Sequence, residues 1–138
     1  MRYELAAIRD LCREIGLSAD PTTEEHIEID LGGGAVLYFQ NADREEDCLM
    51  GFLDVPWHTH DDIIFADAQG NNIGLDYLDL LVGLKEGQVL ICELQKGGRV
   101  IDRYLIHSKY NDEFRYLEEG EQVIVRRAAA SQPENNRA

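Results

Sequence analysis

A run of three consecutive glycines between two strand-like segments restricts this chain more than any other feature. His26–Leu31 alternates strictly between polar and apolar residues, residues 32–34 are all glycine, and Ala35–Phe39 follows as a second apolar segment. Strict alternation is typical of a half-buried strand, and glycine supplies the backbone conformations that a tight turn requires. The sequence therefore predicts an antiparallel β-hairpin here.

A second hairpin is predicted in the C-terminal half. Gln88–Gln95 and Val100–His107 are both rich in apolar and β-branched residues, and Lys96–Arg99 joins them through two central glycines. A short glycine-containing connection between such segments favours a hairpin. Another strand is expected at Cys48–Val55, and shorter ones at Phe114–Leu117 and Gln122–Arg126, while Asp62–Phe65 is either a short strand or an extended segment.

Two segments have the spacing of helices instead. Apolar residues recur at helical intervals in Leu5–Ile15, and Gly16 follows as a stop signal. Leu75–Leu84 has a similar pattern. With 138 residues, the chain has the size of one domain. We predict a single α+β domain over residues 1–127, with a mainly antiparallel sheet on which both helices pack, and a disordered tail over 128–138.

The ends and the cysteines indicate a cytoplasmic protein. No apolar run approaches the ~20 residues of a membrane-spanning helix, and Met1–Leu5 is charged, unlike a signal peptide. Cys12, Cys48 and Cys92 are widely spaced, odd in number and flanked by apolar residues. We therefore interpret them as buried thiols in a reducing compartment.

Acidic residues are concentrated in one half of the chain. Residues 14–84 contain sixteen acidic side chains and one basic side chain, Arg44, which gives this segment a net charge of −15. Residues 85–138 contain nine of each sign. Such a field repels nucleic acid and anionic membranes and attracts cations. The charge therefore predicts a basic protein as partner, with no nucleic acid and no membrane.

The segment Trp57–Asp62 has the ingredients of chemistry. His58 and His60 lie two residues apart on an extended stretch, so their imidazoles point to the same side, and two aspartates follow. His58, His60 and Asp62 resemble the first ligands of the metallo-β-lactamase motif, but Ile63 stands where that motif has histidine. The cupin motif, which also contains a His-x-His pair, has a glutamate where this chain has Phe65.

No other catalytic signature is present, so we expect a binding protein, with no enzyme activity, metal or cofactor. The partner-binding residues are expected on the acidic loop and around the histidines. These candidates are Asp43, Glu45, Glu46, Asp47, Asp54, Trp57, His58, His60, Asp61, Asp62 and the aspartate that follows Ala66, Asp67.

The segment from Trp57 through Asp62 to the apolar pair Ile63 and Ile64 resembles segments in bacterial immunity proteins of polymorphic-toxin systems, and the size, acidity and layout are similar too. The resemblance implies an antitoxin-like protein that binds and neutralises a cognate toxin acting in the cytosol. The acidic half would then cover a basic active-site cleft of that toxin.

Two alternatives stay open. Class I type III secretion chaperones are small, acidic and homodimeric, and begin with a helix leading into three strands. Leu5–Ile15, His26–Leu31, Ala35–Phe39 and Cys48–Val55 follow that order. Such chaperones usually end with a helix, where this chain has the strand-like Val123–Val125. The other alternative is a small metal-dependent enzyme that uses His58 and His60.

Overall fold

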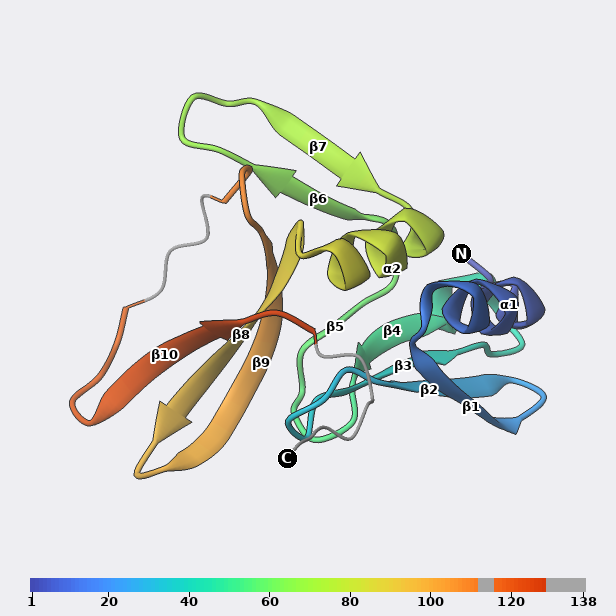
Figure 1. The fold of residues 1–138 in the computed structure, drawn as a ribbon, viewed down its shortest axis with the longest axis horizontal. Coiled ribbons are helices and arrows are strands. Elements are labelled where there is room, and N and C mark those ends of the chain that lie inside the picture. The colour runs from blue at the N-terminus through green and yellow to red at the C-terminus, as the bar shows by residue number, and fades with distance from the viewer. Residues whose placement is uncertain (112–115, 129–138) are drawn as a thin grey trace.

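A five-stranded antiparallel sheet forms the N-terminal half of the fold, which the computed structural model describes for residues 1–111 and 116–128 (Figure 1). Its strands lie in chain order, so each pairs with the strand before it. They are β1 Ser18–Thr23, β2 His26–Asp30, β3 Val36–Gln40, β4 Leu49–Phe52 and β5 His58–Thr59. The three glycines between β2 and β3 have φ of 86°, 60° and 85°, a region that other residues rarely adopt. The predicted hairpin is confirmed.

Strand β1 was not predicted from the sequence. It is polar, contains Pro21 and has almost no buried side chain. It pairs with β2 from Ser18 opposite Asp30 to Thr23 opposite His26, with an irregularity after Pro21. A proline is tolerated at the edge of a sheet because its missing N–H costs no ladder hydrogen bond on the solvent side. An edge position therefore explains why this strand lacks apolar alternation.

The C-terminal half contains a hairpin, a helix and a three-stranded sheet. Strands β6 and β7 pair with each other, and β8 lies between β10 and β9 in the larger sheet. The elements are β6 Ile63–Ala66, β7 Asn72–Leu75, α2 Tyr77–Glu86, β8 Val89–Lys96, β9 Arg99–His107 and β10 Glu121–Arg126. All strand pairs are antiparallel. The α+β class is confirmed, with the strands divided among three sheets.

The first helix ends as its sequence predicts, and the second runs to Glu86. The first helix, α1, spans Leu5–Ile15, and the glycine after it has a left-handed φ of 85°. The second begins two residues later than predicted, because Leu75 still belongs to β7. Asp76 caps it, since its side chain accepts a hydrogen bond from the backbone N–H of Asp79 at 2.8 Å. Neither helix is long and apolar enough to span a bilayer, in the part of the chain that is described.

Three further predicted segments need comment. Strand β4 ends at Phe52, three residues before the predicted Val55, because the chain turns at Leu53 and Asp54. The first half of the predicted strand Phe114–Leu117 lies outside the described residues, and its last two residues are not in a strand. The predicted disordered tail also lies outside the described residues, apart from Ala128.

One apolar core joins the two halves. In Figure 1, the five-stranded sheet with α1 lies on one side of α2 and the three-stranded sheet on the other. Buried side chains from all of these elements contact one another, among them Ile8, Ile27, Phe39, Leu80, Ile91 and Leu105.

The three cysteines are buried and free, as predicted. Burial raises the pKa of the Cys12 thiol to about 11, so this thiol stays protonated and unreactive at neutral pH.

Candidate functional site

The histidine segment lies beside β4 through a close backbone approach. Strand β5 pairs with β4, with His58 opposite Gly51. A Cβ atom at Gly51 would lie 2.7 Å from the carbonyl oxygen of Trp57, which is closer than a methyl group can approach. Only glycine at this position of β4 therefore lets the segment pack so tightly.

The two imidazoles lie together, as their spacing predicted. The ring centroids of His58 and His60 are 5.2 Å apart, with the rings at 89° to each other. His58 Nδ1 donates to the carbonyl oxygen of Pro56 at 2.8 Å, and His60 Nδ1 donates to that of Cys48 at 3.0 Å. A carbonyl oxygen can only accept a hydrogen bond, so the Nδ1 atom of each histidine carries a proton. The Nε2 atoms take no part in these two hydrogen bonds. Residues 1–111 and 116–128 contain no group of three side chains placed to hold a metal ion.

The hydrogen bond from His60 joins the histidine segment to the acidic loop at residues 43–47. This loop includes the 3₁₀ turn η1 Glu45–Asp47, and Cys48 follows it directly. The N-terminal ammonium group also reaches the loop, donating to the carbonyl oxygen of Glu45 at 3.0 Å. The fold thus brings two acidic segments, 43–47 and 61–62, to the same end of the five-stranded sheet. We call Asp43, Glu45, Asp61 and Asp62 the acidic end.

The carboxylates at the acidic end have no cationic partner among the described residues, and all four side chains are exposed. Their neighbours Glu46 and Asp47 differ, because Arg44 forms an ion pair with each of them. These pairs are on the surface, where such contacts contribute little. The acidic end therefore keeps its full negative charge facing the solvent.

Three other predicted residues lie elsewhere and have structural contacts. Asp67 accepts hydrogen bonds from the backbone N–H groups of Gln69 and Asn71 in the β6–β7 turn. A hydrogen bond from the side-chain amide of Asn71 contributes most to lowering the pKa of the Asp67 carboxyl group, and the backbone bonds lower it further. Trp57 is half-buried and its ring lies 5.7 Å from that of Phe52. The third residue, Asp54, is exposed and belongs to an ion cluster whose other carboxylate, Glu93, is buried.

That ion cluster consists of Asp54, Glu93, Arg103 and Arg126. Arg103 Nε donates to both carboxylate oxygens of Asp54 at 3.1 Å, and its Nη1 donates to Glu93. Arg126 Nε donates to Glu93 at 3.0 Å, and its Nη2 donates to the carbonyl oxygen of Gly32 at 2.6 Å. The cluster contains two positive and two negative side chains, so its formal charges cancel. Its hydrogen bonds tie β8, β9 and β10 to the five-stranded sheet.

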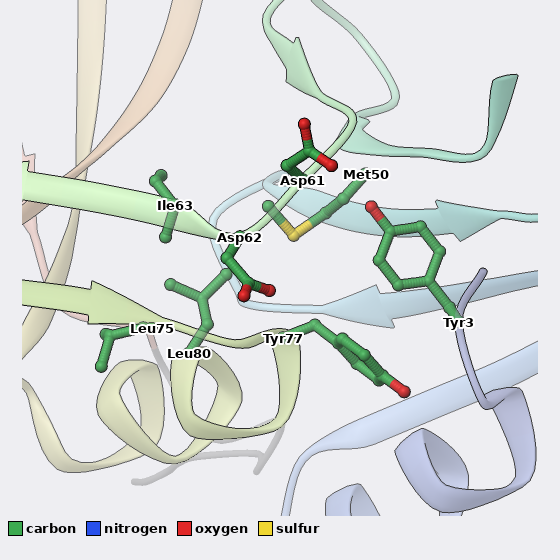
Figure 2. Close-up of a pocket in the computed structure, with 8 residues that line it drawn as sticks. All are labelled: Tyr3, Met50, Asp61, Asp62, Ile63, Leu75, Tyr77 and Leu80. Atoms are coloured by element: carbon green, nitrogen blue, oxygen red, sulfur yellow. The ribbon is translucent and has the colours of Figure 1, made fainter. Parts of the chain in front are cut away.

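A pocket opens beside the acidic end (Figure 2). Its empty volume, including the open mouth, is about 190 Å³. Asp61 and Asp62 line it together with two tyrosines, and apolar side chains cover the rest; the lining residues are Tyr3, Met50, Asp61, Asp62, Ile63, Leu75, Tyr77 and Leu80. The space in it that is open to a water-sized sphere is only about 10 Å³, so the pocket has room for about one water molecule.

Tyr3 is the buried polar residue of this pocket. Only 3% of it is exposed, and its hydroxyl group has no hydrogen-bond partner within residues 1–111 and 116–128. Figure 2 shows this hydroxyl pointing toward Met50 and Asp61, while the hydroxyl of Tyr77 points away. The latter accepts a hydrogen bond from the backbone N–H of Glu4 at 3.1 Å. Burial, and then the negative charges around it, raise the pKa of Tyr3 to about 12, so it stays neutral.

Sequence reasoning missed both Tyr3 and the ion cluster. Nothing in the amphipathic N-terminal segment marks Tyr3, because its neighbours in the pocket come from β4, β6 and α2. The ion cluster did have a signal, since Glu93 and Arg103 are charged residues within two apolar strands and lie opposite each other in the β8–β9 hairpin.

Comparisons with protein-family profiles, curated proteins and solved structures found no match to this chain.

Proposed function

We propose that this protein binds a basic partner protein through its acidic end. The observation that carries the proposal is the group of four exposed carboxylates without a cationic partner in the described residues, within a half-chain whose net charge is −15. Clustered like charges destabilise a fold through mutual repulsion. A bound partner of opposite charge removes that repulsion.

The same negative charge affects the rate at which the partner associates. Electrostatic complementarity raises association rates by ~10 to 10³-fold at low salt, and the effect weakens with ionic strength because the Debye length is ~10 Å at 0.1 M. Nucleic acid is a poor candidate, since its binding depends on cationic side chains that neutralise phosphates.

A toxin is the partner class that we favour. The support is the resemblance of Trp57–Asp62 to segments of immunity proteins, together with the place of this segment beside the acidic loop. An immunity protein neutralises its toxin by binding, and needs no catalytic group of its own. In this proposal, the acidic end covers a basic active-site cleft of the toxin.

Capture of the partner, followed by measured kinetics, tests the proposal. The tagged protein is incubated with extract of its native host and eluted with a salt gradient, and mass spectrometry identifies what is released. A single basic toxin domain is the expected product. A secretion effector would instead favour the chaperone alternative, in which this protein is a dimer by light scattering.

Variants then locate the surface. Asp61→Asn combined with Asp62→Asn removes two charges from the acidic end, whereas Asp20→Asn with Glu24→Gln removes two exposed charges from β1 and its turn. We expect the first pair to slow association about tenfold at low salt and the control pair to change it less than about threefold. Equal effects from both pairs would refute the acidic end as the contact surface.

A further inference from the structure

We infer that the outer edge of β10 binds a second copy of this chain, with the two β10 strands antiparallel across a two-fold axis at Ile124. Strand β10 pairs with β8 on one side, and no strand within residues 1–111 and 116–128 pairs with its other side. The backbone groups on that side are therefore available to a further strand. This inference goes beyond the proposed function and uses a different surface.

Exposed apolar side chains gather on β10 and on the segment that leads into it. Six large apolar side chains are exposed among the described residues, and four of them lie between positions 116 and 125. These four are Tyr116, Leu117, Ile124 and Val125, and the last two are 38% and 49% exposed. Apolar side chains gathered in this way indicate an interaction surface, whereas scattered ones do not.

The charges along β10 are complementary to those of a second, antiparallel copy. Glutamates lie at the start of the strand and just before it, and two arginines lie at its end; these residues are Glu118, Glu119, Glu121, Arg126 and Arg127. An antiparallel copy runs in the opposite direction, so the acidic start of each strand meets the basic end of the other. Opposite charges across such a pair are stabilising.

One register of the two strands matches charges and apolar residues together. Hydrogen-bonding groups of alternate residues point to the same side of a strand, so two-fold pairing places odd-numbered residues opposite odd ones and even opposite even. Moving the axis by one residue would place Glu121 opposite Val125, or Val123 opposite Arg127. With the axis at Ile124, Glu121 lies opposite Arg127, Gln122 opposite Arg126, Val123 opposite Val125, and Ile124 opposite Ile124 of the second copy.

Both members of the charged pair have hydrogen-bonding capacity for this contact. Glu121 accepts a hydrogen bond from the backbone N–H of Glu118 through Oε1 at 2.8 Å, and its second oxygen can accept another. Arg127 is exposed, and its Nη2 donates to the carbonyl oxygen of Lys85 at 3.4 Å. A guanidinium group has five donors, so this long bond leaves donors for Glu121 of the second copy.

The place of β10 in the fold keeps the acidic segments of two copies apart. Residues 85–138 carry equal numbers of acidic and basic side chains, whereas residues 14–84 carry the net charge of −15. In Figure 1, β10 lies at one end of the long axis, and α1 and β1 lie at the other. Pairing through β10 therefore leaves both five-stranded sheets on the outer sides of the dimer. The assembly is also closed, because each copy uses the same edge in the contact.

Sedimentation velocity over a range of protein concentrations measures this self-association. We expect a reversible monomer–dimer equilibrium in the micromolar range, because a contact between two strands of 6 residues buries little surface. A chain that is still monomeric at ~1 mM, where even a very weak dimer is half formed, would overturn the inference. Assembly beyond a dimer would overturn it as well.

Two charge-reversal variants test the register. Glu121→Arg and Arg127→Glu each place like charges opposite one another at two symmetry-related positions, so each variant alone should self-associate about tenfold more weakly. In an equal mixture of the two variants, the introduced arginine faces the introduced glutamate, and the unmodified residues of the pair also face each other. The mixture should therefore form a heterodimer with about the affinity of the unmodified protein. Two folded variants that fail to associate when mixed would refute the register.

An apolar variant and its control locate the axis. Ile124→Lys places two ammonium groups opposite each other and should weaken self-association about tenfold, whereas Ile64→Lys, at a residue of β6 that is 70% exposed, should leave it unchanged. Equal effects would refute β10 as the contact, and so would concentration-dependent protection from hydrogen exchange at amides of another edge strand, such as β1, instead of alternate amides of β10.

Partner capture is interpreted separately from these measurements. A monomeric chain that captures a basic toxin would overturn this inference and leave the proposed function in place. A β10 dimer that captures no basic protein would do the reverse. The dimer alone does not favour the chaperone alternative, because the identity of the captured protein decides between toxin and effector.

Discussion

Neutralising Glu93 removes the carboxylate that two arginines share inside the fold. The side chains of Arg103 and Glu93 are 4% and 7% exposed, and that of Arg126 is 23% exposed. Glu93→Gln keeps the shape of the side chain but leaves Arg103 with only Asp54, 46% exposed, and Arg126 with no carboxylate partner among the described residues.

The expected cost follows from this burial. Removing one partner of a buried ion pair destabilises by about 3–5 kcal/mol, because the other charge is left uncompensated. Asp54 still pairs with Arg103 at 3.0 Å, which keeps the effect at the lower end. We therefore expect Glu93→Gln to lower the free energy of unfolding by about 3 kcal/mol. Urea denaturation followed by the fluorescence of the single tryptophan, Trp57, measures it.

A double-mutant cycle tests the reasoning behind that value. Glu93→Leu with Arg103→Met replaces the most buried pair by apolar side chains of similar length, so the charges that lose a partner are those of Asp54 and Arg126, which are 46% and 23% exposed and can be solvated. The double variant should be more stable than either single variant, because replacing a buried pair is often close to neutral. A loss below about 1 kcal/mol in Glu93→Gln, or additive losses in the double variant, would refute the view that this pair is buried and coupled.

Three further outcomes are expected. Tyr3→Phe should be at least as stable as the unmodified protein at pH 7, since it removes an unpartnered hydroxyl. Between pH 10 and 12 the free energy of unfolding of the unmodified protein should fall by about 2–3 kcal/mol relative to that of this variant, because the phenol of Tyr3 has a pKa near 10 in the unfolded chain and of about 12 in the fold. Urea titrations of both proteins at both pH values measure this difference, and equal changes in the two proteins would contradict it. Gly51→Ala should lower the free energy of unfolding by about 1–3 kcal/mol and shift the tryptophan emission, since the added methyl group meets the Trp57 carbonyl; an unaltered spectrum would contradict the close approach. Asp67→Ala should speed amide hydrogen exchange at Gln69 and Asn71 without changing partner association, and slower association would place Asp67 in the contact surface instead.

The sequence was sufficient for the elements whose signals are local. The hairpins at the glycine turns and the helix ending at Gly16 depend on neighbouring residues, and each was predicted within a few positions. Strand β1 was missed because an edge strand needs no apolar face. The boundary at Leu75 was misplaced because its side chain fits the apolar pattern of the helix, although Asp76 is a good N-cap.

The candidate site was predictable in its charge and not in its shape. Clustering of Asp43–Asp47 and of Asp61 with Asp62 is visible in the sequence, and so is the pairing of His58 with His60. That Cys48 would accept a hydrogen bond from His60 depends on the register of β4 and β5. The place of Tyr3 beneath the aspartates depends on packing between segments far apart in the chain, which no local pattern encodes.

The order of the strands has a consequence for how the chain folds. Every strand pair except β8 with β10 joins consecutive strands, so most pairing involves short loop closures that form quickly. The last strand is different, because Arg126 reaches back 94 residues to the carbonyl oxygen of Gly32. A chain cut before Glu121 would retain every consecutive hairpin, but it would present the backbone of β8 as an unpaired edge, and such edges recruit strands from other chains. Pairing with β10 therefore satisfies the backbone of β8 on that side and moves the open edge of the sheet to β10, the strand that Arg126 ties to Gly32.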